Sequence, residues 1–109
     1  MITGASGVVG KELSNLLIQN KKLEICLLSN SNIKQKKKNK IKIIKHDLTK
    51  PLICSYKIDI LIHCAAKNPL SKTGKKMNII FKKNVQMTKN LINFANKKNI
   101  KKIIFLSSM

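Results

Sequence analysis

The segment Ile2-Thr3-Gly4-Ala5-Ser6-Gly7-Val8-Val9-Gly10 decides the fold of this 109-residue chain. Apolar residues lead into Thr3, glycines follow at every third position, and an amphipathic helical pattern begins immediately afterwards. This order predicts a strand, a tight turn and a helix. Gly4 permits the sharp reversal, Gly7 lets the backbone approach a ligand, and Gly10 lets the helix pack closely on the strand. Because helix N–H groups and the positive end of the helix dipole converge there, we interpret the turn as a dinucleotide pyrophosphate site.

The remaining apolar runs alternate in the pattern of an α/β protein, whereas three glycines alone also fit an ordinary strand-to-helix turn. We predict helices over 8–20 and 77–98, and strands over 1–3, 23–28, 41–45, 58–66 and 103–106. Continuous apolar strands are typical of a parallel sheet with both faces covered. The helix faces expected against the sheet consist of Val9, Leu13, Leu16 and Leu17 in the first helix, and Phe81, Val85, Thr88, Leu91, Ile92 and Ala95 in the second.

The net charge of +19 suggests nucleic-acid binding, but the composition also has another explanation. All 23 basic residues are lysine, and aromatic residues make up only 4% of the chain. The arginine forks and stacking aromatics that read bases are therefore missing or scarce. A coding sequence rich in A and T produces this lysine, isoleucine and asparagine usage without a nucleic-acid partner. We predict no specific nucleic-acid partner, and a basic nucleic-acid-binding domain stays an alternative.

The lengths of the apolar runs, the cysteines and the histidines limit the class of protein. No apolar run approaches the roughly 20 residues that cross a bilayer, so no membrane contact is expected. Cys26, Cys54 and Cys64 lie in or beside apolar runs, which indicates reduced thiols in a cytoplasmic protein. His46 and His63 are interpreted as strand-end residues, and no metal site is predicted.

In a sheet of this kind, ligands bind beyond the carboxyl ends of the strands. The dinucleotide pattern asks for Asp or Glu about 20 residues past the glycines, where a carboxylate bonds the ribose hydroxyls. This chain has Ser29 and Asn30 instead. Loss of the carboxylate removes repulsion against a 2′-phosphate, and Lys34 lies nearby in the sequence. The pattern favours NADP without excluding NAD.

Five segments in this order resemble the extended branch of the short-chain dehydrogenase/reductase family, the NAD-dependent epimerase/dehydratase group. They are the turn at 3–10, His46-Asp47-Leu48, Cys64-Ala65-Ala66, Asn84-Val85-Gln86-Met87-Thr88 and Phe105-Leu106-Ser107-Ser108. The resemblance covers essentially the whole chain and implies a Rossmann-type doubly wound sheet that binds NAD or NADP. The cofactor-binding residues that we expect are Gly4, Ser6, Gly7, Val8, Val9, Gly10, Asn30, Asp47, Leu48, Cys64, Ala65 and Ala66.

The resemblance also implies roles for single residues. Asp47 would accept from the adenine amino group while Leu48 packs on the ring, although Asp47 also suits a cap of the next turn. The small side chains of 64–66 would let the cofactor lie across the backbone, or simply end a buried strand.

Two residues correspond to positions near the family's chemistry. Asn84 would order the active site from the long helix, although it also fits a surface position, and Met87 stands where the family has glycine. Ser108 would hydrogen-bond the reacting oxygen of the substrate, with Ser107 beside it.

The family's catalytic tyrosine, with a lysine four residues later, follows the last predicted strand, and this chain has only Tyr56, followed at that spacing by Ile60. We therefore expect residues 1–109 to form a partial NAD(P)-binding domain, truncated at both ends and inactive alone. The expected whole is an oxidoreductase or epimerase acting on a nucleotide sugar. A non-catalytic NAD(P)-binding module is an alternative. The unpaired edge of the last strand favours a homo-oligomer.

Overall fold

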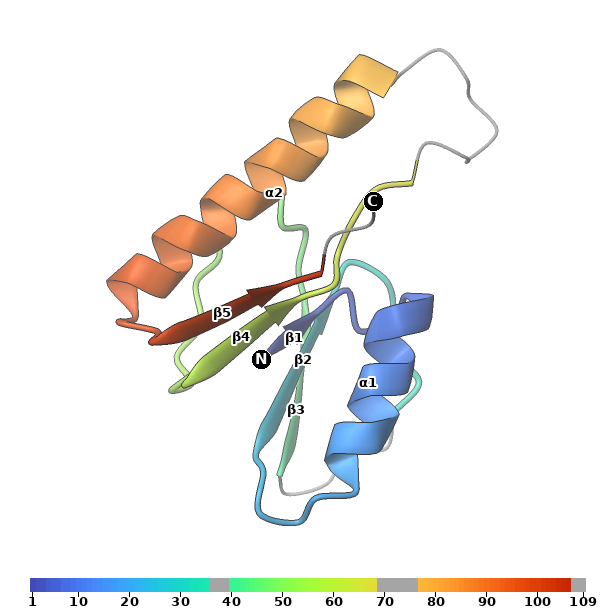
Figure 1. Ribbon diagram of the computed structural model, residues 1–109, viewed down its shortest axis with the longest axis vertical. Coiled ribbons are helices and arrows are strands. Elements are labelled where there is room, and N and C mark those ends of the chain that lie inside the picture. Colours follow the sequence, from blue (N-terminus) through green and yellow to red (C-terminus); the bar gives the residue numbers. More distant parts are fainter. Residues whose placement is uncertain (36–39, 69–76, 107–109) are drawn as a thin grey trace.

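The computed structural model describes residues 1–35, 40–68 and 77–106, which form a single parallel sheet with a helix on each face. The strands are β1 (Ile2–Thr3), β2 (Ile25–Ser29), β3 (Ile41–Lys45), β4 (Ile60–His63) and β5 (Lys102–Phe105), and the helices are α1 (Val8–Ile18) and α2 (Met77–Lys97). The strand order is β3-β2-β1-β4-β5, and every neighbouring pair is parallel (Figure 1). This confirms the predicted doubly wound sheet.

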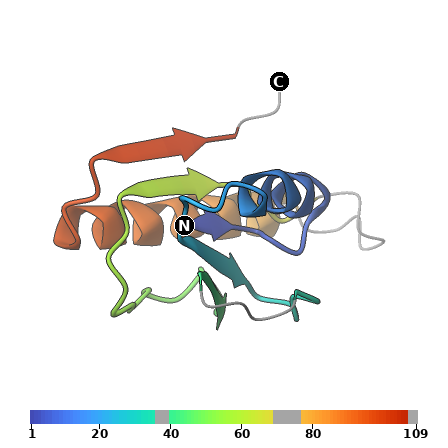
Figure 2. The same ribbon diagram turned by 90° about the horizontal axis from the view of Figure 1, so that it is seen from below.

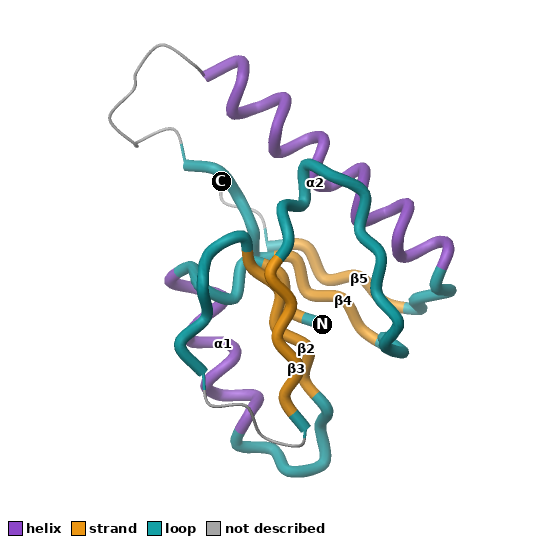
Figure 3. The backbone as a smooth tube through the Cα atoms, turned by 180° about the vertical axis from the view of Figure 1, so that it is seen from behind, coloured by secondary structure: helices purple, strands orange, loops and turns teal. Residues whose placement is uncertain are grey.

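The two faces of the sheet have separate cores, because α1 and α2 lie on opposite sides (Figure 2). On the α1 side, Ile2, Leu27 and Ile41 are buried together. On the α2 side, the connection from β3 to β4 runs beside the helix (Figure 3) and inserts Leu48 into the same core as Leu61. Two segments distant in sequence thereby fix the position of α2 relative to the strand ends.

Helix α1 is turned differently from the prediction. Leu13 and Leu17 pack on the sheet as expected, but Val9 is 59% and Leu16 65% exposed. Ser14, which does not belong to the predicted apolar face, is buried and donates from Oγ to the Gly10 carbonyl oxygen at 2.6 Å. Gly10 lies against the Gly4 carbonyl oxygen, and this close approach turns the side of α1 that contains Gly10 and Ser14 toward β1.

Helix α2 also buries a different stripe from the one predicted. Its buried residues are Met87, Asn90, Leu91, Phe94 and Ala95. Phe81 is 70% and Ile92 45% exposed, so only Leu91 and Ala95 of the expected face are buried. Asn90 faces the core because its amide nitrogen donates to the Leu48 carbonyl oxygen at 2.7 Å, a contact that apolar periodicity does not reveal.

The strands at the centre and at the edge of the sheet differ in burial although both are apolar. Ile2 and Thr3 of β1 pair with β2 on one side and β4 on the other, and both are buried. Every residue of β5 is exposed, and this strand pairs only with β4 among the described residues.

The predicted strand at 58–66 is shorter in the structure, so that 64–66 leave the sheet as a connection. Neither described helix is long and apolar enough to span a membrane.

Candidate functional site

The glycine turn after β1 is held by close backbone contacts. Gly4 has φ +69°, and a Cβ atom there would lie 2.6 Å from the Ala65 backbone nitrogen. A Cβ atom on Gly10 would overlap the Gly4 carbonyl oxygen, which accepts from the Gly7 N–H at 2.9 Å. Gly4 and Gly10 are therefore required by packing, while a Cβ on Gly7 would meet only that same oxygen at 3.2 Å. Gly7 is exposed and lines the cavity described next.

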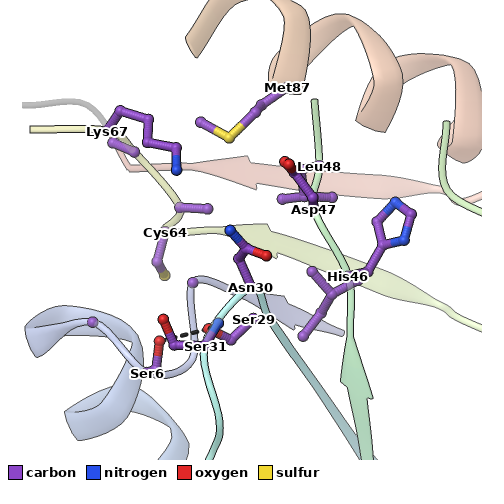
Figure 4. Close-up of a pocket in the computed structure, with 15 residues that line it drawn as sticks. Ser6, Ser29, Asn30, Ser31, His46, Asp47, Leu48, Cys64, Lys67 and Met87 are labelled. Atoms are coloured by element: carbon purple, nitrogen blue, oxygen red, sulfur yellow. Dashed lines mark hydrogen bonds between the residues drawn. The ribbon is translucent and has the colours of Figure 1, made fainter. Parts of the chain in front are cut away.

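This turn forms one wall of a cavity of about 210 Å³ at the carboxyl ends of β1, β2, β3 and β4. Helix α2 closes it from the side of Met87 (Figure 4). The residues that line it are Gly4, Ser6, Gly7, Leu28, Ser29, Asn30, Ser31, His46, Asp47, Leu48, Cys64, Ala65, Ala66, Lys67 and Met87. Nine residues predicted from the sequence to contact a cofactor are among these: Gly4, Ser6, Gly7, Asn30, Asp47, Leu48, Cys64, Ala65 and Ala66.

The structure does not bring all the predicted residues into this cavity. Gly10 lies behind the turn and supports it from within the helix. The side chains of Val8 and Val9 are 84% and 59% exposed and do not line the cavity. Only their backbone N–H groups, in the first turn of α1, remain as candidate ligand contacts. Ser108 lies outside the described residues.

Asn84 is not among the residues that line the cavity, but its side chain hydrogen-bonds the backbone of Lys67, which is. Its side-chain oxygen accepts from the Lys67 N–H at 2.8 Å, and its side-chain nitrogen donates to the Lys67 carbonyl oxygen at 3.2 Å. Both polar groups of the amide are thus used to tie α2 to the connection that follows β4. Asn84 is therefore not a free surface amide.

A cluster of hydroxyl groups occupies the β2 end of the cavity. Ser6 Oγ and Ser29 Oγ are 2.5 Å apart, and Ser29 Oγ also accepts from the Ser31 N–H at 3.1 Å (Figure 4). Ser29 is only 4% exposed. Its position at the end of β2 was the signal for it in the sequence, although the contact with Ser6 could not be read there.

At the opposite end of the cavity, Asp47 is fixed by the turn that follows β3. Its Oδ1 atom accepts from the Thr49 N–H at 3.0 Å and from the Thr49 hydroxyl at 2.9 Å. These hydrogen bonds, backbone first, hold the pKa of the carboxyl below its usual value, so the group is charged at neutral pH. The capping role is therefore present, and because it uses Oδ1, the other oxygen is compatible with a ligand contact.

Besides Ser29, five lining residues were not among the predicted contacts, and they are Leu28, Ser31, His46, Lys67 and Met87. Met87 reaches the cavity through the rotation of α2 described above, and is 5% exposed. Lys67 lines the cavity where the chain leaves β4, and His46 where it leaves β3. Met87 fills the position that is glycine in the family's motif, so this wall is a thioether side chain instead of bare backbone.

Burial shifts the pKa values of three titratable side chains in or near the cavity, those of His63, Cys64 and Cys26. His63 Nδ1 lies 2.7 Å from Thr3 Oγ1, its ring packs against Phe105, and burial lowers its pKa. Burial raises the pKa of the Cys64 thiol, which lines the cavity in its protonated form at neutral pH. Burial first, then the neighbouring Cys54, raises the pKa of Cys26 to about 11. Within the described part of the chain, no three His, Cys, Asp or Glu residues form a metal-binding group.

The arrangement fits a dinucleotide. A helix N-terminus behind a glycine turn suits the pyrophosphate, hydroxyl groups suit a ribose, and a charged carboxylate beside Leu48 suits an amino-substituted ring. The family model of the NAD dependent epimerase/dehydratase family matches residues 1–109. The chain belongs to this family. No curated protein sequence matches significantly.

Solved structures of the family's enzymes share the fold. A UDP-galactose 4-epimerase has a TM-score of 0.80 at 23% identity, over 98% of this chain and 37% of its own. The Thermus thermophilus UDP-glucose 4-epimerase in complex with NAD has a TM-score of 0.76 at 18% identity, over 98% and 36%. The dTDP-glucose 4,6-dehydratase DesIV from Streptomyces venezuelae, with NAD bound, has a TM-score of 0.74 at 14% identity, over 94% and 37%. The chain thus spans little more than a third of these enzymes.

Proposed function

We propose that this chain is the NAD(P)-binding part of an enzyme that oxidises, reduces, epimerises or dehydrates a nucleotide sugar. The observation that carries the proposal is the cavity at the carboxyl ends of four parallel strands, bounded by a turn in which Gly4 and Gly10 admit no side chain. Family membership supports the class of reaction. The structural neighbours in complex with UDP-glucose and NAD, or with NAD and UDP, support the substrate class.

The proposed binding mode places each part of the cofactor on a different strand end. The pyrophosphate lies on the Gly4–Gly7 turn, where the first N–H groups of α1, including those of Val8 and Val9, have no partner within the helix. The adenosine lies toward Ser29, Asn30 and the Asp47–Leu48 pair. Cys64, Ala65 and Ala66 form the wall along which the cofactor lies.

For the chemistry, a bound nicotinamide supplies a hydride acceptor or donor. We assign Ser108 to the hydrogen bond with the reacting oxygen of the substrate. Asn84 is a positioning residue, because it holds Lys67 and lies outside the cavity lining. The only tyrosine, Tyr56, does not line the cavity, and the Lys42 ammonium lies over its ring at 4.2 Å. We therefore expect residues 1–109 alone to bind cofactor without turning over nucleotide sugars.

Isothermal titration calorimetry of NAD⁺ and NADP⁺ into the folded chain tests this proposal. We expect saturable binding of at least one of them at a stoichiometry of one. In a Gly7→Glu variant, a carboxylate at the pyrophosphate position should abolish binding, whereas Asn93→Glu, which adds the same charge on the exposed side of α2, should preserve it. Absence of heat from a chain with native circular dichroism would refute the proposal.

A non-catalytic NAD(P)-binding module is the second reading, because the cavity lining supports cofactor binding and includes no tyrosine among the described residues. It predicts the same binding, and is distinguished by whether the chain, expressed with its adjacent coding sequence, converts nucleotide sugars. The basic nucleic-acid-binding reading predicts that, at the same salt concentration, the chain prefers one RNA or DNA sequence over others, whereas lysine attraction alone gives no such preference.

Two further proposals concern assembly and compartment. Among the described residues β5 pairs only with β4, and its exposed Ile103 and Phe105 support the proposal of a homo-oligomer. The free thiols Cys26, Cys54 and Cys64 support a cytoplasmic location.

A further inference from the structure

The β2 end of the cavity lacks the carboxylate that the dinucleotide-binding pattern has at this position. A carboxylate at this position hydrogen-bonds the ribose 2′-hydroxyl and repels a phosphate attached to the same oxygen. Here the residue is Ser29, the last residue of β2, and its side chain is 4% exposed. Asp47 is the only carboxylate that lines the cavity among the described residues, and it lies beyond β3. The ribose end thus lacks the group that would reject a 2′-phosphate.

The two hydroxyl groups at this end of the cavity contact each other. Ser29 Oγ accepts from the Ser31 N–H and shares a short contact with Ser6 Oγ. Because one hydroxyl of the Ser6–Ser29 pair donates to the other, the second hydroxyl keeps its proton for a further acceptor. Phosphate oxygens are acceptors only, so they match this free proton, whereas a ribose hydroxyl does not require it.

A second cavity of about 200 Å³ adjoins the first at Ser6, on the α1 side of the sheet. Its walls come from the first turns of α1 and from the segment after β2, and they include Lys11, Lys34, Ser14 and Asn32. None of the described residues that line it is acidic. The two neighbouring spaces therefore share Ser6, whose hydroxyl contacts that of Ser29, and the described side chains around the second space are cationic or neutral.

A third lysine reaches the same place from β3. Lys45 is the register partner of Ser29, so its side chain leaves the same face of the sheet on the adjacent strand. Its Nζ atom donates to Asn32 Oδ1 at 3.0 Å, and Asn32 lines the second cavity. Lys11, Lys34 and Lys45 thus approach from three different elements.

From this geometry we infer that the chain selects a dinucleotide with a 2′-phosphate on its adenosine ribose, NADP(H) over NAD(H). The 2′-phosphate is placed between the Ser6–Ser29 hydroxyl pair and the cavity that Lys11 and Lys34 line, with Lys45 at its rim. The inference rests on the proposed function, because it names which cofactor the same site takes. It differs from the NAD found in the structural neighbours in complex with that cofactor.

The test must separate a built phosphate site from the attraction that a net charge of +19 exerts on any anion. Adenosine 2′,5′-bisphosphate and adenosine 3′,5′-bisphosphate have equal charge and differ only in the position of one phosphate. We expect the 2′ isomer to bind about tenfold more tightly, and NADP⁺ to exceed NAD⁺ by a similar factor at low salt. Equal affinity of the two isomers would show charge attraction only and would overturn the inference.

Single-residue variants test where the 2′-phosphate binds. Lys45→Gln and Lys34→Gln should each lower the affinity for NADP⁺ by about threefold or more while leaving that for NAD⁺ unchanged. Lys89→Gln, on the exposed side of α2, removes the same charge on the opposite face of the sheet and should leave the ratio unchanged. If Lys89→Gln lowers the ratio as much as Lys45→Gln does, the assignment of the phosphate is wrong.

Ser29→Asp restores a carboxylate and should reverse the preference toward NAD⁺. Because Ser29 is buried, circular dichroism must first show that the variant folds, and the exposed lysine variants provide the test independently. Binding of NAD⁺ and NADP⁺ with equal affinity would overturn this inference and leave the proposed function standing. Failure of both to bind would instead reject the proposed function.

Discussion

The first and last strands along the chain, β1 and β5, contrast sharply, although both are short and apolar. β1 lies between two partners, and the turn that follows it tolerates no side chain at Gly4 or Gly10. β5 pairs with β4 alone among the described residues, and Ile103, Ile104 and Phe105 are 43%, 41% and 55% exposed. Apolar composition thus predicts a strand in both places, but it does not predict burial.

The contrast separates two halves of the proposed enzyme site. The walls expected to hold the adenosine and pyrophosphate are packed and closely specified by backbone contacts. The strand expected to lead to the reacting serine is exposed. Substitutions near β1 should therefore have large effects and those on β5 small ones.

Gly10→Ala should give the largest effect. The new Cβ atom would overlap the Gly4 carbonyl oxygen, so α1 must move away from β1. We expect a loss above about 3 kcal/mol in the free energy of unfolding, despite the better helix propensity of alanine. Chemical denaturation measures this, and Gly7→Ala, with its contact at 3.2 Å, is the milder control. Equal stability of the two variants would contradict the described packing.

Leu61 and Ile103 provide a matched pair, because they are register partners on neighbouring strands. Leu61 is 0% exposed and Ile103 43%. Truncation of Leu61 to alanine should cost about 2 to 3 kcal/mol, and Ile103→Ala less than about 1 kcal/mol. Comparable losses in urea unfolding would mean that β5 is covered in solution, for instance in an oligomer.

Asn84→Ala removes both hydrogen bonds between α2 and Lys67. The expected cost is about 1 kcal/mol in stability, with weaker cofactor binding because Lys67 lines the cavity. Asn84→Asp keeps the acceptor for the Lys67 N–H but places a carboxylate oxygen against the Lys67 carbonyl oxygen, so its affinity in calorimetry should also fall. Unchanged affinity in both variants would rule out a positioning role.

A smaller effect is expected from pH. Burial lowers the pKa of His63 below the ordinary value of 6.5, so the unfolded chain binds this proton at a higher pH than the folded chain. The free energy of unfolding should therefore fall as the pH decreases through that value and level off below the folded pKa. His63→Gln should flatten this part of the profile. A profile as steep in the variant as in the wild type would assign the slope to another group.

The sequence predicted the order of elements well because glycine spacing and apolar runs are local signals. The fold class followed from them, and nine of the residues expected to contact a cofactor line the cavity. The sequence could not predict how each helix is rotated about its own axis on the sheet. Asn90 is buried through its hydrogen bond to Leu48, and Met87 through packing in the core on the α2 side. Ser14 is buried while bonded within its own helix, and Phe81 is exposed. Hydrophobic periodicity ranks faces by apolar content, so polar residues buried by hydrogen bonds escape it.

The central claim is that the cavity beside the glycine turn holds the dinucleotide. Titration of NADP⁺ into the ¹⁵N-labelled chain, followed by amide chemical shifts, tests it directly. The account predicts saturable shifts at Gly4, Gly7, Ser29, Asp47 and Ala65, with the β5 residues Lys102 and Ile103 unaffected. Shifts spread over the lysine-rich surface, or none at all in a folded chain, would contradict it.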